Sequence, residues 1–350
     1  MKLRVVKPGV TAALGAALLF GGGTPLAKLL LQGVNPWLLA GMLYLGAGSG
    51  LTLYRLFNHR RAGKLEPEEW KWLAGAILFG GVAGPVLLLF GLKGLPASGA
   101  SLLLNTEGVF TALLAWFLFR ENFDRRIVLG MIAIVGGAIV ISWPGDARFS
   151  TVLPALAVVG ACLSWSIDNN LTCKISHCEA TWIASVKGFA AGGINLGIAI
   201  LSGADWPAWT GIGAMLLVGC FSFGISLVLF VTALRQLGTA RTGAYFSVAP
   251  FFGAVLAVPL LGETVDGRLI IAGTLMALGI WLHLTERHEH EHFHEIMAHE
   301  HVHDPDCLHH QHEHDKMGLP LNNHHRHRHG HAPLAHLHDH FPDTHHRHEH

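Results

Sequence analysis

Two stretches of the chain decide the fold: residues 105–121 read NTEGVFTALLAWFLFRE, and residues 247–263 read SVAPFFGAVLAVPLLGE. They lie 142 residues apart, and each is an apolar run that closes with a glutamate, Glu121 in the first and Glu263 in the second. A sequence that resembles itself at a fixed offset predicts that the fold contains one structural unit twice.

The composition places most of the chain in a lipid bilayer. Hydrophobic residues make up 51% of the 350 residues and charged residues only 14%, whereas soluble domains carry about 25% charged residues. The formal net charge is zero, so we expect no nucleic-acid partner, which would need a basic surface. The five cysteines contain no CxxC pair, and we therefore expect neither a disulfide framework nor a thiolate zinc site.

Ten apolar runs are long enough to cross a membrane, since a spanning helix needs roughly 20 mostly apolar residues. They cover residues 10–31, 36–54, 70–91, 96–119, 127–143, 152–172, 181–201, 210–234, 239–261 and 268–285. The first run is too long for the apolar part of a signal peptide, so we expect it to remain as the first helix. The sequence predicts an all-α integral membrane protein with ten transmembrane helices.

The charges in the connections between these runs predict the orientation. With the N-terminus inside, the inner connections hold fourteen Lys and Arg residues, and the outer ones hold three: Lys93, Arg148 and Arg268. Because Lys and Arg accumulate on the cytoplasmic side, we expect both the N-terminus and the C-terminus in the cytoplasm of a bacterial-type cell with this protein in its inner membrane.

Each copy of the repeat holds five predicted helices, an odd number, so the second copy must enter the membrane from the opposite side. Inverted repeats of this kind are typical of secondary transporters, whose substrate site lies near the midplane where the repeats meet. A channel, a receptor or a membrane enzyme with ten helices stays open as an alternative.

The two quoted stretches make the chain similar to the drug/metabolite transporter superfamily, specifically its EamA-type proteins, over about residues 10–285. The resemblance implies two inverted five-helix repeats, residues 1–147 and 148–285, and a secondary transporter that exports amino acids, metabolites or other small solutes and is not an enzyme. Members of the family typically carry proline inside these stretches, as Pro250 does, but the first copy has Gly108 there, preceded by Glu107.

Four ionisable residues interrupt the predicted spans: Lys28, Glu107, Asp168 and Lys187. A charge inside a membrane is costly, so such residues are candidates for function. Glu107 lies at the centre of the 96–119 run, where a carboxyl group can hold either a proton or a cationic substrate. Lys28 lies near a helix end and can extend its ammonium group to the interface.

A polar sequence in the sixth run, Asp168, Asn169 and Asn170, corresponds through the repeat to residues 23–25 in the first run. Both are poor sequences for a continuous helix, and matching helix breaks in two repeats indicate a substrate cavity. Lys187 in the seventh run lies near a place where the resemblance implies an arginine, so we expect it to pair with Asp168 or Glu107 or to contact an anionic substrate. The predicted substrate-binding or proton-binding residues are Glu107, Asp168, Asn169, Asn170, Lys187 and Asn105.

The tail, residues 286–350, holds 23 of the 26 histidines and few apolar residues, so we expect it to be disordered without metal. Histidine-rich tracts bind Zn, Ni, Co or Cu. The predicted metal ligands are His288, His290, His292, His294, His299, His301, His303, His309, His310, His312 and His314. A pH-sensitive brush of charges and a low-complexity expansion are the competing interpretations.

These observations favour a proton-coupled exporter of a divalent transition metal, in which the tail captures or senses the ion. Export of amino acids or other small metabolites, with the tail as a metal sensor or buffer, is the alternative, and a metal sensor without transport is a third. The expected partners are the lipid bilayer and the substrate, and a homodimer stays open. We expect no required cofactor, since no GxxxxGK[ST] nucleotide-binding loop is present.

Overall fold

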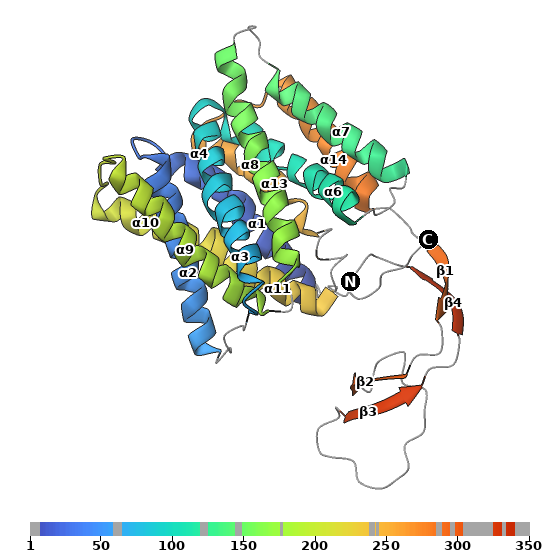
Figure 1. Cartoon of the computed structure of the whole chain (residues 1–350). Helices are drawn as coiled ribbons and strands as arrows, with labels where there is room; N and C mark the ends of the chain where they lie inside the picture. Colours follow the sequence, from blue (N-terminus) through green and yellow to red (C-terminus); the bar gives the residue numbers. More distant parts are fainter. Residues whose placement is uncertain are drawn as a thin grey trace, which may run out of the picture. The chain divides into compact units, whose positions relative to one another are not determined.

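The computed structural model describes residues 8–58, 65–119, 125–143, 149–175, 178–237, 242 and 245–284, together with four short segments of the tail. The chain divides into two compact units, Met1–Glu286 and Arg287–His350, and each is described by itself. The first unit is a bundle of helices, drawn in Figure 1.

The helices of the first repeat are α1 (Pro8–Leu30), α2 (Pro36–Phe57), α3 (Trp70–Ala76), the π-helix η1 (Ile77–Ala83), α4 (Gly84–Gly94), α5 (Ala97–Leu103), α6 (Thr106–Phe119) and α7 (Arg125–Ser142). Those of the second repeat are α8 (Phe149–Cys173), α9 (Ala180–Leu201), α10 (Trp209–Gly219), the π-helix η2 (Cys220–Ile225), α11 (Ser226–Leu237), α13 (Ala249–Leu261) and α14 (Gly267–Leu284). The predicted all-α membrane fold is confirmed.

Among the described residues, six helices are long and apolar enough to cross a membrane. They are Pro8–Leu30, Pro36–Phe57, Trp70–Gly94, Val152–Thr172, Ala180–Leu201 and Trp209–Ala233, and shorter apolar helices cover Val128–Ser142, Ala249–Leu261 and Gly267–Leu282. These nine helices follow nine of the ten predicted runs, and α5 with α6 covers the tenth. The number of ten crossings remains a prediction.

The packing of the helices has the symmetry that a duplicated unit produces. Corresponding helices of the two repeats pack on each other, α2 on α9 and α7 on α14. The first helix of each repeat packs on the third and fourth helices of the other: α1 contacts α11 and α13, whereas α8 contacts α4 and α6. The repeats are therefore interlocked, and the first helix of each packs against the other repeat.

Small residues allow the close approach of α2 to α9. A Cβ atom on Gly48 would lie 3.0 Å from the backbone nitrogen of Phe189, and one on Gly188 would lie 2.7 Å from the Cα atom of Gly48. Between membrane helices, where lipid removes most of the hydrophobic driving force, such backbone contact supplies van der Waals attraction. The glycine pairs thus fix the central α2–α9 contact.

The helix breaks lie at other positions than the sequence predicted. Both α1 and α8 run without interruption through residues 23–25 and 168–170. The break is instead at residues 104–105, between α5 and α6, and residues 247–248 form a turn at the corresponding point before α13. Pro250 accordingly stands in the first turn of α13, a position that proline favours, and does not kink a helix.

Local hydrogen bonds stabilise the break between α5 and α6. The Asn105 side-chain amide donates to the Leu102 carbonyl over 2.8 Å, and the Thr106 hydroxyl donates to the Leu103 carbonyl over 2.8 Å. Asn and Thr side chains compete with helical hydrogen bonds in this way. Because α6 begins after the break, Glu107 lies in its first turn and not at the centre of a spanning helix, which corrects the predicted position.

A π-helix interrupts the third helix of each repeat at the corresponding place: η1 spans Ile77–Ala83, and η2 spans Cys220–Ile225. A π-helix changes the backbone hydrogen-bond pattern and is frequent at functional sites. The Gly80 carbonyl of η1 accepts two side-chain hydrogen bonds, from Tyr44 over 2.6 Å and from Trp165 over 3.0 Å. Neither π-helix was predicted from the sequence.

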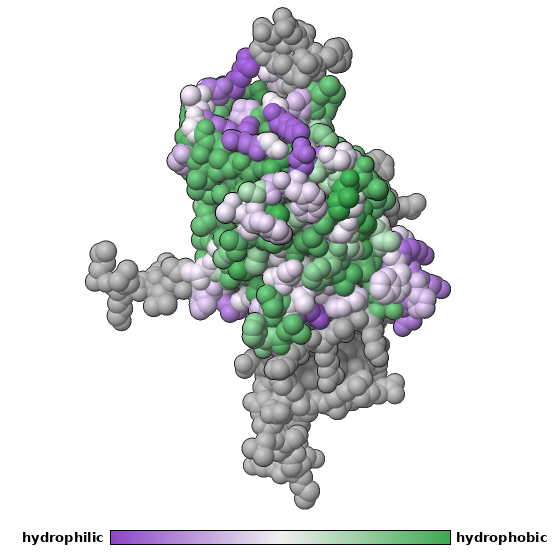
Figure 2. All heavy atoms as spheres, turned by 90° about the vertical axis from the view of Figure 1, so that its left-hand side faces the viewer, coloured by the Kyte–Doolittle hydropathy of each residue, from purple (hydrophilic) through white to green (hydrophobic). Residues whose placement is uncertain are grey.

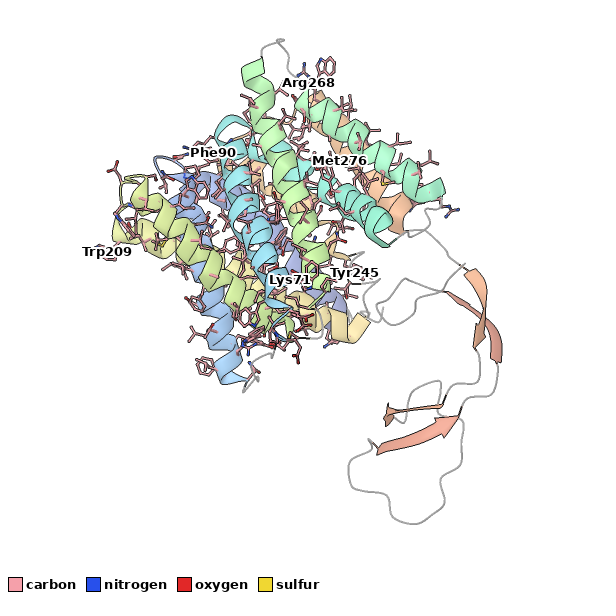
Figure 3. All side chains as sticks on the ribbon, viewed as in Figure 1. Lys71, Phe90, Trp209, Tyr245, Arg268 and Met276 are labelled. Atoms are coloured by element: carbon pink, nitrogen blue, oxygen red, sulfur yellow. The ribbon has the colours of Figure 1, made fainter. Side chains whose placement is uncertain are left out.

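The outer surface of the bundle suits a bilayer. Seen from the side of α2, α9 and α10, it is largely hydrophobic, and the hydrophilic residues gather in patches (Figure 2). Lys71 and Arg268, predicted for opposite sides of the membrane, lie at opposite ends of the bundle (Figure 3). Trp209, 86% exposed at the start of α10, is the kind of aromatic residue that is enriched at membrane–water interfaces.

The second unit, the tail, contains the strands β1 (Glu289–His294), β2 (Ala298–His303), β3 (His325–Gly330) and β4 (Leu334–Asp339). β1 pairs antiparallel with β4, and β2 pairs antiparallel with β3. These paired strands cover 24 residues of the tail, and disorder of the tail without metal stays a prediction. Antiparallel pairing satisfies the backbone hydrogen bonds of extended segments without needing an apolar core.

Candidate functional site

A cavity of about 330 Å³ lies between the two repeats. Its lining residues come from α2, α8, the connection from α8 to α9, α9, η2 and α11 and are Tyr44, Ala47, Leu51, Thr172, Cys178, Ala180, Ile183, Ala184, Lys187, Gly188, Phe223 and Leu227. The cavity lies toward the end of the bundle where α2 and α8 end and α9 begins. That end carries the inner connections of the predicted topology, so the cavity faces the predicted cytoplasmic side.

One ion pair lies at the wall of this cavity. Lys187 Nζ lies 2.5 Å from Oδ1 and 2.6 Å from Oδ2 of Asp168, and the Thr172 hydroxyl donates to Oδ1 over 3.0 Å. The side chains are 16% and 11% exposed for Lys187 and Asp168. Of its two predicted partners, Lys187 pairs with Asp168. Lys187 and Thr172 line the cavity, whereas Asp168 lies behind them.

A glycine in η1 makes room for this pair. A Cβ atom on Gly80 would overlap the Asp168 carboxylate. The corresponding contact in the other half joins Gly23 of α1 to Ser222 of η2, since a Cβ atom on Gly23 would lie 3.0 Å from that of Ser222. A glycine makes room at each of these two helix crossings, but only the crossing of η1 with α8 carries a charged side chain.

A second polar group lies on another face of α8. The Asn169 amide donates to Glu107 Oε1 over 2.9 Å, and the Ser166 hydroxyl contacts the Glu107 carbonyl over 2.9 Å. Glu107 lies in the first turn of α6, where the helix dipole favours a negative charge. Glu107 and Asn169 do not line the 330 Å³ cavity, so the predicted site residues form two separate groups.

The remaining two predicted residues make local hydrogen bonds. The Asn170 amide donates to the Ser166 carbonyl over 2.8 Å, one turn back in α8. The Asn105 amide donates to the Leu102 carbonyl and lies 3.6 Å from the Met276 sulfur. Neither lines the cavity, and both positions are explained by stabilisation of the backbone.

Glu263, which closes the second repeated stretch, joins the two repeats through its carboxylate, a role not predicted from the sequence. It accepts hydrogen bonds from the backbone nitrogens of Ala97 over 2.5 Å and Ser98 over 2.9 Å, at the start of α5. Nearby, the Lys28 ammonium donates to the Leu95 carbonyl. The glutamate that closes each repeated stretch could have predicted this contact, because a carboxylate stabilises the unpaired N–H groups at a helix start.

A different inter-repeat contact lies at the opposite end of the bundle, beside the cavity. Arg55 Nη1 of α2 lies 2.5 Å from Glu179 Oε2, and the same oxygen accepts from the Trp182 nitrogen over 3.1 Å at the start of α9. Close to it, Cys178 lines the cavity, and burial, with a smaller contribution from Glu69, raises the pKa of its thiol.

The predicted metal ligands fall on the tail strands or outside them. Six lie on β1 and β2: His290, His292, His294, His299, His301 and His303. The other five, His288, His309, His310, His312 and His314, lie outside the described residues. In the part of the chain that the structure describes, no three His, Cys, Asp or Glu residues are grouped so as to hold a metal ion.

With the fold and the site described, comparison with known proteins identifies the family. The EamA-like transporter family matches residues 7–143 and 152–285, one match for each repeat. The chain belongs to this family of membrane transporters. The matched ranges lie within residues 1–147 and 148–285, and the tail lies outside them.

Individual relatives agree with this assignment. An uncharacterized transporter of Methanothermobacter thermautotrophicus is 30% identical over 294 residues, covering 78% of this chain and 85% of that protein. A probable amino-acid metabolite efflux pump of Salmonella typhimurium is 24% identical over 204 residues, covering 55% of this chain and 68% of that protein. A solved crystal structure has the same fold, with a TM-score of 0.58 at 19% identity over 79% of this chain and 96% of its own.

Proposed function

We propose that this protein exports a small organic solute that combines an apolar body with charged groups, as an amino acid does, by alternating access between its two repeats. The observation that carries this proposal is the cavity between the repeats. Its volume of about 330 Å³ falls within the range of small-molecule sites. The name of the Salmonella typhimurium relative, a probable amino-acid metabolite efflux pump, supports the same solute class.

The ion pair gives the cavity its selectivity. Lys187 lines the cavity, and Asp168 lies within 2.6 Å of its ammonium group. A solute carboxylate competes with Asp168 for Lys187, and a solute ammonium group then takes the place of Lys187 at Asp168. A zwitterion therefore exchanges one satisfied charge pair for two, whereas a neutral solute offers no such exchange.

The same cavity disfavours a divalent metal ion as the transported substrate, although the sequence favoured one. A fixed ammonium group repels a dication, and the lining residues of the cavity offer one thiol, Cys178, and no carboxylate. First-row transition metals are bound by several N, O or S ligands together. We therefore place organic-solute export first and keep metal export as the hypothesis to be tested against it.

Proton coupling is assigned to Glu107. Its carboxylate accepts one hydrogen bond from Asn169, and α8 carries both Asn169 and the Asp168 of the ion pair. Binding of a proton at Glu107 changes its interaction with Asn169 and can shift α8 against α6. We also propose that the protein lies in the inner membrane with both termini in the cytoplasm.

For the tail we propose metal binding, because the strand register aligns histidines. In the β2–β3 pair, His299 stands opposite His329 and His301 stands opposite His327. This register brings histidines from two separate segments of the tail into one ladder. Histidine-rich tracts bind Zn, Ni, Co or Cu.

The transport proposal is tested in proteoliposomes by counterflow of radiolabelled amino acids, supplied as a panel. Lys187→Met is expected to lower the rate at least about tenfold, since it removes the charge that binds the carboxylate. Lys71→Met, an exposed lysine at the predicted inner end of the bundle, is the matched control and is expected to keep the rate. If no amino acid of the panel shows counterflow at wild-type protein levels, the proposal is overturned.

The tail proposal is tested on the full chain in detergent by the amount of Zn bound at equilibrium. Alanine at His299, His301, His327 and His329 is compared with alanine at an equal number of histidines outside the described residues, His309, His310, His312 and His314. The first set is expected to lose more metal. An equal loss from both sets would show that only the number of histidines matters.

A further inference from the structure

Two aromatic side chains belong to the walls of two different cavities. Tyr44 and Phe223 line the 330 Å³ cavity, and they also line a void of about 30 Å³. The inner void is bounded further by residues of α1, α4 and α8, among them Thr24, Pro85 and Trp165. The inner void has about one tenth of the volume of the cavity, and the two rings belong to the walls of both.

Contacts from both repeats hold these rings. The two ring centroids lie 6.1 Å apart with an interplanar angle of 25°, which is a stacked arrangement. Phe20 meets the ring of Phe223 edge to face at 5.9 Å. The Tyr44 hydroxyl donates to the Gly80 carbonyl over 2.6 Å. Tyr44 is thus tied to the π-helix of the first repeat, and Phe223 belongs to the π-helix of the second.

The proposed function gives this arrangement a role, and the following step rests on it. We infer that Tyr44 and Phe223 form the barrier between the cavity and the inner void, that the apolar part of the solute rests on their rings, and that the hydrogen bond from Tyr44 to Gly80 holds the barrier closed. Tyr44 is accordingly a specificity-determining residue, since its ring meets the solute body while Lys187 meets the solute charge.

Gly80 connects the barrier to the charged site. Its carbonyl accepts the Tyr44 hydroxyl, and its Cα atom lies so close to Asp168 that a Cβ atom would overlap the carboxylate. A solute that separates Lys187 from Asp168 changes the position of that carboxylate, and therefore the space around Gly80. Gly80 therefore responds to solute binding at the ion pair and also accepts the hydrogen bond that holds the barrier closed.

The barrier is tested by the accessibility of introduced cysteines from the cavity side. Thr24→Cys places a thiol in the inner void, and Ala184→Cys places one in the cavity as the matched control. A small charged methanethiosulfonate is applied to the inner face of membrane vesicles, and peptide mass spectrometry identifies the modified cysteine, so the native cysteines are kept. We expect Ala184→Cys to react at least about tenfold faster than Thr24→Cys.

Tyr44→Phe then separates the hydrogen bond from the ring. It keeps the aromatic barrier and removes the hydroxyl, and a hydrogen bond of ordinary strength predicts that Thr24→Cys reacts about 3–10-fold faster in this background. Ala184→Cys is expected to react at an unchanged rate. Melting temperatures of both double variants establish that the fold is retained.

Two results would overturn the inference. If Thr24→Cys reacts as fast as Ala184→Cys while Tyr44 is present, the rings are no barrier. If Tyr44→Phe leaves the reaction of Thr24→Cys unchanged, the bond to Gly80 does not hold the barrier closed. Because this experiment uses no solute, a failure of amino-acid counterflow together with the expected labelling would reject the proposed function and leave the barrier standing.

Discussion

At the scale of single residues, the site depends on a charge pair in a low-dielectric setting. Replacing one partner leaves the other charge buried and unpaired, whereas replacing both partners leaves no unpaired charge. The rule that ionisable residues inside a membrane are functional candidates predicted Asp168 and Lys187 from the sequence. The same rule also predicted Glu107. It could not predict that Glu107 contacts a different face of α8 from the one that carries the ion pair.

The pair makes a double-variant prediction. Asp168→Asn is expected to destabilise the protein by about 3–5 kcal/mol, the range for breaking a buried pair, and toward the lower end because the side chains keep 16% and 11% exposure. Asp168→Asn combined with Lys187→Met is expected to recover most of the melting temperature but none of the transport. Melting curves in detergent measure the first, and counterflow measures the second. Equal melting temperatures for the single and double variants would contradict the prediction.

A glycine makes a second prediction at this scale. Gly80→Ala places a Cβ atom in the space of the Asp168 carboxylate, so we expect the Lys187 pair to be displaced and transport to fall at least about tenfold. The control is Gly193→Ala in α9, where an added Cβ atom meets nothing within 4 Å. There, alanine is expected to stabilise the helix by about 0.5–1 kcal/mol and to keep transport. Wild-type transport by Gly80→Ala would show that the crossing of η1 and α8 is not tight.

At the scale of helices, the sequence predicted the apolar runs but not what interrupts them. Hydropathy reports how long a run is, and it cannot separate α5 from α6, because the break consists of two apolar or small polar residues with local hydrogen bonds. Hydropathy does not reveal the π-helices either, since η1 reads ILFGGVA, which continues the apolar run without a polar residue. Residues 168–170 form no helix break, because their polar groups are satisfied by Lys187, Glu107 and Ser166 within a continuous helix.

The start of α5 gives a prediction at this scale. Glu263→Ala removes the acceptor of the Ala97 and Ser98 N–H groups, and the loss of a helix cap costs about 1 kcal/mol. Since this cap also joins α13 to α5, we expect an altered transport rate as well as a lower melting temperature. Asp266→Ala is the control, because Asp266 caps Leu269 at the start of α14 over 2.8 Å. It is expected to lower the melting temperature alone, and an equal effect of both variants on transport would count against a role for Glu263 in the movement of the repeats.

At the scale of the whole molecule, the repeat was the most informative property of the sequence. The 142-residue offset predicted two units of inverted orientation, and the exchanged packing of α1 and α8 is the three-dimensional form of that duplication. What the repeat cannot predict is where the halves differ. Asp168 corresponds to Gly23, and Lys187 has no charged counterpart in α2, so the charged half of the cavity depends on substitutions that break the symmetry.

The metal and organic-solute hypotheses make opposite predictions for the intact cell. In a deletion strain, the full chain, a version ending at Glu286, and Glu107→Gln are compared for cellular Zn, Ni, Co and Cu by mass spectrometry, at equal membrane levels. Because the cavity lacks a set of metal ligands, we expect none of the three to lower the content of any metal. The version without the tail is expected to export amino acids at the full rate, since the membrane unit is complete by residue 286. A metal content that falls with the full chain and is restored by Glu107→Gln would instead establish metal export, and the shortened version would then tell whether the tail delivers the ion.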